Sequence, residues 1–162
     1  MQRVFGSIWA VLIALFVVAI PIQFYLAGHG AMEGAYSAYC ADKTNKCTTP
    51  LMITAWDPHV IVGTLMLLVS LLILLTALAA RPGRRILWMS VALFVFMVIQ
   101  YILPFTFDSA STRWIAALHA VNALIVTGLA GTLLYRAWTY LPGTGRSQPT
   151  TPAPVKTATT PT

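Results

Sequence analysis

The chain has 162 residues, of which 58% are hydrophobic and only 9% are charged, and its formal net charge is +6. A soluble domain carries about 25% charged residues, so this composition cannot cover a wetted surface. The basic residues flank apolar runs and do not form a stripe with interleaved aromatic residues, which argues against a nucleic-acid partner. The composition therefore indicates a membrane protein of one domain.

Four apolar stretches are long enough to span a bilayer, and none contains Asp, Glu, Lys or Arg: residues 4–26, 59–80, 86–107 and 114–135. A helix of about 22 residues is roughly 33 Å long, which matches the hydrocarbon core of a bilayer. The first stretch exceeds the apolar region of a cleaved signal peptide, so we expect it to remain as a helix. We predict an all-α, polytopic membrane protein, an antiparallel bundle of four transmembrane helices in contact with the lipid bilayer.

The connections and the basic residues define the expected topology. Residues 81–85 form a short link, so the second and third helices should be antiparallel neighbours. This link contains three Arg residues and the terminal flanks contain four further basic residues, whereas the other side of the membrane has only Lys43, Lys46 and Arg113. An excess of Lys and Arg marks the cytoplasmic side, so we expect a multi-pass protein of the bacterial plasma membrane with both termini cytoplasmic.

The remaining segments lie outside the spans. Residues 29–58 should form a long outer loop, and residues 1–140 should contain the whole membrane domain. Residues 141–162 are rich in Pro and Thr and lack apolar residues to bury, so we expect a disordered cytoplasmic tail.

Lipid is as apolar as the helix surfaces, so helices in a membrane gain stability mainly by bringing their backbones close together. We therefore expect small residues where the helices contact one another. The second helix offers Gly63 and Ser70, and the fourth offers Ala116, Ala120, Ala123, Thr127, Gly128 and Gly131.

Two histidines, His59 and His119, lie near the outer ends of the second and fourth stretches. A polar group inside a membrane is costly and is therefore a candidate functional residue. Neutral imidazoles bind iron or zinc, and the cores of helix bundles hold cofactors between ligands on facing helices. Asp57 and Pro58 have the residue types of a helix start, so we expect His59 in the first turn, a few ångströms nearer the surface than His119.

Other polar residues share the level of His119. Counting inward from the outer ends places Gln23, Gln100 and His119 roughly 8 Å below the surface, and Asn122 lies one turn further on the same helix face. Each helix thus contributes to one polar layer. Two interpretations remain open: the layer surrounds a cofactor bound by the two histidines, or its side chains only hydrogen-bond across helices and fix their packing. His29 offers a third imidazole for a zinc site, but its flanking glycines favour a solvated position.

The only cysteines are Cys40 and Cys47, both in the expected outer loop. An oxidising compartment favours a local disulfide between them, which would staple the loop. A thiol–disulfide relay is the alternative, although the spacing differs from the Cys-x-x-Cys of dedicated oxidoreductases.

Several of these segments resemble an uncharacterised family of small four-helix bacterial membrane proteins. The matching pieces are residues 22–28 (IQFYLAG), residues 57–63 at the start of the second helix, Gln100, and residues 118–124 (LHAVNAL). The family has no established activity, so this resemblance implies the fold and no function.

The layout also distantly resembles one four-helix half of heme A synthase. That family places heme-ligating histidines near the outer ends of its second and fourth helices, positions that His59 and His119 match. Its catalytic carboxylate lies one helical turn before the first histidine, whereas Asp57 lies only two residues before His59. The resemblance therefore implies heme binding more than heme hydroxylation.

The leading hypothesis from the sequence is a b-type heme held by His59 and His119 for electron transfer or heme handling, with Gln23, Gln100 and Asn122 around it. A homodimer or a redox protein in the membrane would be its partner. The alternative is a non-catalytic accessory or scaffold protein without a cofactor. A transporter is less favoured because no charged residue lies within the spans. No nucleotide-binding loop, nucleophile elbow or zinc-protease motif is present in the sequence, which favours a protein that is not an enzyme.

Overall fold

The computed structural model describes residues 2–42, 52–106 and 113–138, and within these ranges its regular secondary structure is entirely helical. They are α1 (Gln2–Asp42), α2 (Met52–Ala80), α3 (Arg84–Ile102), the short 3-10 helix η1 (Leu103–Thr106) and α4 (Arg113–Trp138). Each α-helix contains a segment long and apolar enough to cross a membrane: Val4–Glu33, Asp57–Ala80, Arg84–Ile102 and Ala117–Trp138. The predicted all-α fold with four membrane-spanning helices is confirmed.

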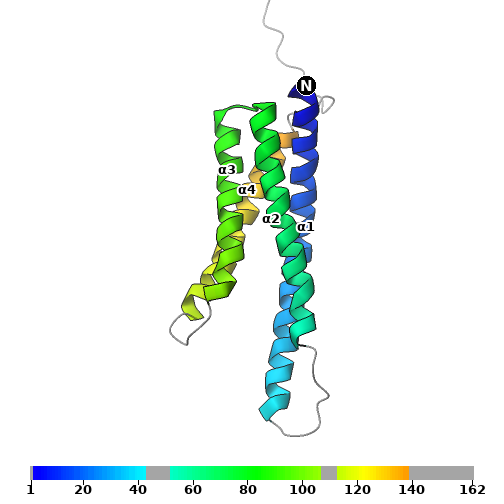
Figure 1. Cartoon of the computed structure of the whole chain (residues 1–162), viewed down its shortest axis with the longest axis vertical. Helices are drawn as coiled ribbons and strands as arrows, with labels where there is room; N and C mark the ends of the chain where they lie inside the picture. The colour runs from blue at the N-terminus through cyan, green and yellow to red at the C-terminus, as the bar shows by residue number, and fades with distance from the viewer. Residues whose placement is uncertain (1, 43–51, 107–112, 139–162) are drawn as a thin grey trace, which may run out of the picture.

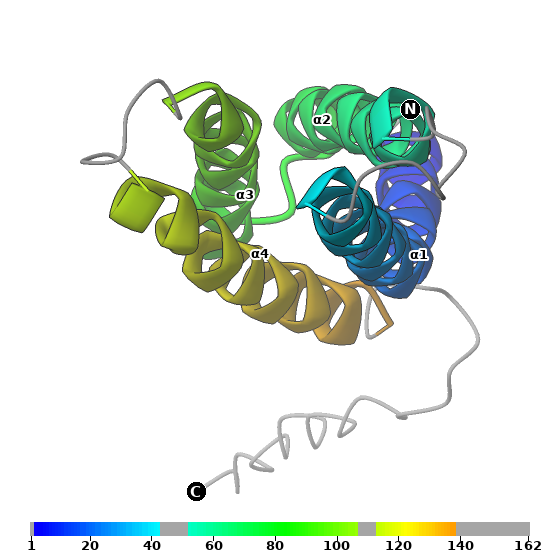
Figure 2. The same ribbon diagram turned by 90° about the horizontal axis from the view of Figure 1, so that it is seen from below.

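The four helices form a closed antiparallel bundle. Each helix packs against its neighbours in the chain, and α4 packs back against α1, as the end-on view in Figure 2 shows. At the end opposite the N-terminus, the α1–α2 hairpin extends well beyond the α3–α4 pair (Figure 1). The predicted outer ends of the helices all lie toward this end of the bundle.

The link between α2 and α3 is as short as predicted. Arg81 adopts a left-handed backbone conformation with φ 50°, and Gly83 follows with φ 105°. Pro82 disfavours a right-handed helical conformation at the residue before it, so α2 ends here. The Arg81 N–H still donates a hydrogen bond to the Ala77 carbonyl oxygen at 3.0 Å, which closes the last turn of α2.

Two helices extend further than the sequence predicted. Helix α1 continues to Asp42 through part of the expected outer loop, and α2 begins at Met52. The predicted helix start at Asp57–Pro58 is therefore wrong, and His59 lies in the second turn of α2. Proline removes one backbone hydrogen bond, and in a membrane protein neighbouring groups can satisfy the freed carbonyl. Pro58 is accordingly accommodated inside its helix, as Pro21 is in α1.

Helix α3 ends earlier than predicted, at Ile102. Pro104 follows two residues later and has no N–H to continue the α-helical pattern, so the chain tightens into η1.

Cys47 and residues 141–162 lie outside the described residues. The disulfide with Cys40 and the disordered tail therefore stay predictions.

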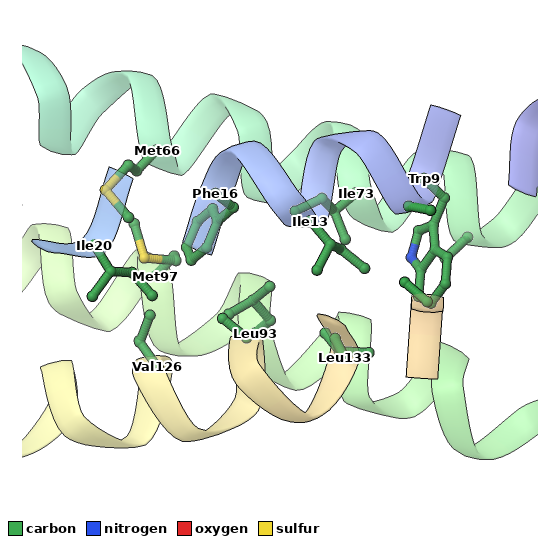
Figure 3. Packing of buried hydrophobic residues seen from close by; sticks show 14 residues of the cluster. Trp9, Ile13, Phe16, Ile20, Met66, Ile73, Leu93, Met97, Val126 and Leu133 are labelled. Carbon is green, nitrogen blue, oxygen red and sulfur yellow. The ribbon is translucent and has the colours of Figure 1, made fainter. Parts of the chain in front are cut away.

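An apolar core fills the bundle from the N-terminal end to the polar layer. Helix α1 contributes Trp9, Ile13, Phe16 and Ile20 at intervals of three or four residues, the spacing of one helix face. Figure 3 shows Ile20, Met66, Met97 and Val126 gathered at one end of this core. These four residues each lie within two turns of a polar-layer residue on their own helix, so they form the apolar side of that layer.

The small-residue prediction was right for α2 and wrong for part of α4. Ser70 is fully buried, but Gly128 and Gly131 face outward, as does Ala120. The inward face of α4 has the helical spacing 122, 126, 130, 133 and 137, and it contains larger side chains such as Leu133. Large apolar side chains also cover the outside of the bundle, which is consistent with contact with a lipid bilayer.

Candidate functional site

The polar layer predicted from the sequence exists as a contact network toward the end of the bundle opposite the N-terminus. We define the polar layer as Gln23 from α1, His59 from α2, Gln100 from α3, and His119 and Asn122 from α4. All four helices contribute to it because each passes through the same level of the bundle. Every one of these side chains is buried or half-buried.

A chain of hydrogen bonds joins α3 to α4. The Asn122 side-chain nitrogen donates to the Phe96 carbonyl oxygen at 2.9 Å and to the Gln100 Oε1 atom at 2.6 Å. The Gln100 Nε2 atom in turn lies 2.8 Å from the His119 Nε2 atom. Asn122 is only 5% exposed, so this chain is anchored in the bundle interior. It fixes both the Gln100 amide and one nitrogen of the His119 ring.

A second polar contact joins α1 to α2. The Gln23 Nε2 atom donates to the His59 carbonyl oxygen at 2.9 Å. Gly63 makes room for this contact, because a Cβ atom at position 63 would lie 2.8 Å from Gln23 Nε2. The sequence suggested Gly63 as a small residue at a helix contact, and the structure shows the Gln23 amide in the space that its missing side chain leaves.

The two histidine rings meet across the interior of the bundle. Their centroids lie 6.3 Å apart with an angle of 58° between the ring planes. The rings come from diagonally opposite helices and from positions 60 residues apart in the sequence. The predicted difference in depth between His59 and His119 therefore does not keep them apart.

Two polar atoms of the layer are buried without a hydrogen-bond partner among the described residues: Nδ1 of His119 and Oε1 of Gln23. Buried polar atoms in proteins almost always have a partner, so each orphaned atom calls for a physical explanation.

His29 does not join His59 and His119 in a larger set of metal ligands. The described residues contain no group of three or more His, Cys, Asp or Glu side chains placed to hold a metal ion. The ring of His29, which is exposed, lies near Tyr25 of its own helix.

Sequence reasoning found the members of the layer but missed two backbone contributions. It did not identify the Phe96 carbonyl as the anchor of Asn122, and it named Gly63 as a helix contact without naming Gln23 as the side chain that approaches it. A glycine one turn after His59 was a visible signal for close approach. No sequence signal identifies the Phe96 carbonyl, because every residue has a backbone carbonyl.

Comparison with known proteins gives one match. No curated protein and no solved structure matches the chain significantly, so the distant resemblance to heme A synthase gains no support. Residues 48–107, which include α2, α3, His59 and Gln100, match a family of unknown function. This match confirms the predicted resemblance to an uncharacterised family, although it does not reach His119. Over that segment the chain is similar to the family of unknown function DUF6220, and the match supplies a family but no activity.

Proposed function

We propose that the polar layer holds one b-type heme, with His59 and His119 as the two ligands of its iron, and that the protein serves electron transfer or heme handling. The observation that carries this proposal is the meeting of the two imidazoles at a centroid distance of 6.3 Å inside an apolar bundle. Imidazole is a common ligand of iron, and bundle cores are a recurring place for ligands from facing helices.

The spacing of the rings supports two ligands on one metal ion. A bond from an imidazole nitrogen to a first-row metal is roughly 2 Å long and the nitrogen lies about 1 Å from the ring centroid, so two imidazoles that shared one ion would have centroids at most roughly 6 Å apart. The observed centroid distance of 6.3 Å is close to that limit, so His59 and His119 would need little movement to hold the same ion.

The chain's own groups define the environment of the pair. Ile20, Met66, Met97 and Val126 form an apolar side, and methionine side chains adapt readily to the shape of a bound group. Gln23 fixes the backbone at His59, and Gln100 contacts the ring of His119. An iron with two imidazole ligands supplies one-electron transfer, with its potential set by the ligands and by burial.

Heme binding requires two local adjustments. The lone pair of His119 Nε2 cannot bind iron while it faces the Gln100 amide at 2.8 Å, so Gln100 must release it. The space beside Gly63 is occupied by the Gln23 amide, which must also shift if the macrocycle lies there. Both groups are the ends of flexible side chains, so side-chain rotation would make these two adjustments.

The deciding experiment is an absorption titration of the purified heme-free protein with hemin, using an affinity tag without histidine. The wild-type protein should give a saturable Soret shift with one heme per chain and the visible bands of a six-coordinate, low-spin iron. His59→Ala and His119→Ala should each lose the six-coordinate spectrum. His29→Ala is the matched control, since it removes the third histidine outside the pair, and it should titrate like the wild type.

The alternative is an accessory protein in which the polar layer only fixes the packing of the helices. The hydrogen bonds from Asn122 favour it, because they already join α3 to α4 without any ligand. This alternative predicts no saturable hemin spectrum in any variant and a loss of thermal stability in His119→Ala. A wild-type titration without a Soret shift would therefore replace the heme proposal with this one.

The topology completes the proposal. We place both termini in the cytoplasm of a bacterial cell because the Arg-rich α2–α3 link lies at the same end of the bundle as the N-terminus. The polar layer then lies near the outer face of the plasma membrane, where a redox protein or a second copy of this chain would approach the heme.

A further inference from the structure

The direction of the hydrogen bonds in the polar layer is set by a backbone group. The Phe96 carbonyl oxygen can only accept a hydrogen bond, and Asn122 lies 2.9 Å from it. The Asn122 amide must therefore point its nitrogen, and not its oxygen, toward α3. The same nitrogen has a second proton, which it donates to Gln100 Oε1 at 2.6 Å.

This orientation determines the orientation of Gln100. Its Oε1 atom accepts from Asn122, so its Nε2 atom is the one that faces His119. An amide nitrogen can only donate, so the His119 Nε2 atom must accept. A neutral imidazole has one protonated and one unprotonated nitrogen, and the proton of His119 must then lie on Nδ1.

The reversed arrangement fails at the anchor. Turning both amides over would make His119 Nε2 the donor, but it would also place the Asn122 oxygen against the Phe96 carbonyl oxygen. Two acceptors would then face each other at 2.9 Å without a proton between them. The lone pairs of two oxygen atoms at that distance repel each other, so the observed direction is the stable one.

We propose that Gln100 is a positioning residue that holds His119 as the Nδ1–H tautomer in the heme-free protein and masks the lone pair of its Nε2 atom. Iron binds to a nitrogen lone pair. With Nδ1 protonated and Nε2 engaged by Gln100, His119 offers iron no lone pair until Gln100 withdraws. The masking step rests on the proposed heme site, whereas the tautomer does not. In this tautomer the Nδ1 atom of His119, which has no hydrogen-bond partner among the described residues, is a buried N–H donor.

Nitrogen-15 NMR of the heme-free, full-length protein in lipid nanodiscs tests the tautomer directly. The two ring nitrogens of a neutral histidine have well-separated chemical shifts that depend on which one is protonated. The His119 signals are assigned by their loss in His119→Ala. We expect Nδ1 to be protonated in the wild type, and a protonated Nε2 would overturn the proposal.

Matched substitutions test the role of Gln100. Gln100→Met keeps the length of the side chain but removes the amide donor, so the Nε2–H form of His119 should become the major one. Gln23→Met is the control, because the Gln23 amide donates to a backbone atom of His59 and not to the His119 ring. It should leave the His119 tautomer unchanged. If Gln100→Met fails to fold, Gln100→Leu serves the same purpose, because it also removes the amide donor. An unchanged tautomer in the folded variant would show that Gln100 does not hold it.

Hemin affinity tests the masking. A neutral hydrogen bond contributes about 0.5–1.5 kcal/mol, so Gln100→Met should bind hemin about two- to tenfold more tightly than the wild type. Weaker binding would mean that Gln100 supports the bound heme and does not mask its ligand. The two proposals fail separately: an Nδ1–H signal without hemin binding refutes only the heme site, and hemin binding with an Nε2–H signal refutes only the role of Gln100.

Discussion

Replacing Asn122 with leucine tests how far the polar layer stabilises the bundle. The side chain is 5% exposed and donates two hydrogen bonds, one to Phe96 and one to Gln100. Leucine has the same number of side-chain heavy atoms and the same branching, but no donor. The Phe96 carbonyl is part of a helix, so it loses little. The Gln100 Oε1 atom loses its donor inside the bundle.

The magnitude follows from these two losses. Hydrogen bonds between membrane helices contribute about 0.6 kcal/mol on average and at most about 1.7 kcal/mol. An orphaned buried acceptor costs about 1–3 kcal/mol. Asn122→Leu should therefore lower the free energy of unfolding by about 2 kcal/mol. Thr132→Val is the control, because Thr132 is exposed and bonds only within its own helix; it should change stability by less than about 0.5 kcal/mol.

A double-mutant cycle sharpens this prediction. Gln100→Met removes the acceptor that Asn122→Leu leaves orphaned, so the double variant should be more stable than the sum of the two single effects by about 1 kcal/mol. Equilibrium unfolding in lipid bicelles by steric trapping measures all four proteins. Additive effects, or an Asn122→Leu protein as stable as the wild type, would refute the hydrogen-bond chain.

Three further predictions concern packing and topology. Gly63→Ala should push the Gln23 amide off the His59 carbonyl and destabilise the protein, whereas Gly128→Ala is the control, because a Cβ at position 128 meets nothing within 4 Å. In the same unfolding assay Gly63→Ala should be less stable than Gly128→Ala by about 1 kcal/mol, and equal stabilities would contradict the close approach. Ser70→Leu should overpack the fully buried site and lower the free energy of unfolding by about 1–3 kcal/mol. Ser70→Ala should lower it by less than about 1 kcal/mol, and a Ser70→Leu protein as stable as the wild type would contradict the close packing around Ser70. Alkaline phosphatase fused to either terminus should be inactive and green fluorescent protein should be fluorescent, because both termini are expected in the cytoplasm; active phosphatase would reverse the topology.

The sequence predicted the spans well because membrane helices depend on length and apolar composition, which are local properties. It predicted the helix ends less well. Pro58 has the residue type of a helix start, but α2 begins at Met52, so the proline lies inside the helix. The Gly28-His29-Gly30 segment suggested a loop, yet α1 continues through it. Local residue preferences are small beside the loss of backbone hydrogen bonds in a membrane, and the helix persists.

The members of the polar layer were predictable from their level in the membrane, but their contacts were not. The helical rise gives depth, and it placed Gln23, Gln100 and His119 together correctly. The rotation of each helix about its axis depends on tertiary packing, which one sequence does not reveal. This is why the outward position of Gly128 and the donation from Gln23 to the His59 carbonyl were not foreseen.

The central claim is that His59 and His119 bind the same iron, and electron paramagnetic resonance of the ferric, hemin-loaded protein tests it most directly. Two imidazole ligands on one iron predict a low-spin signal in the wild type. His59→Ala and His119→Ala should each convert it to a high-spin signal, while His29→Ala keeps it low-spin. A high-spin wild type, or a low-spin signal that survives the loss of either His59 or His119, would contradict the account.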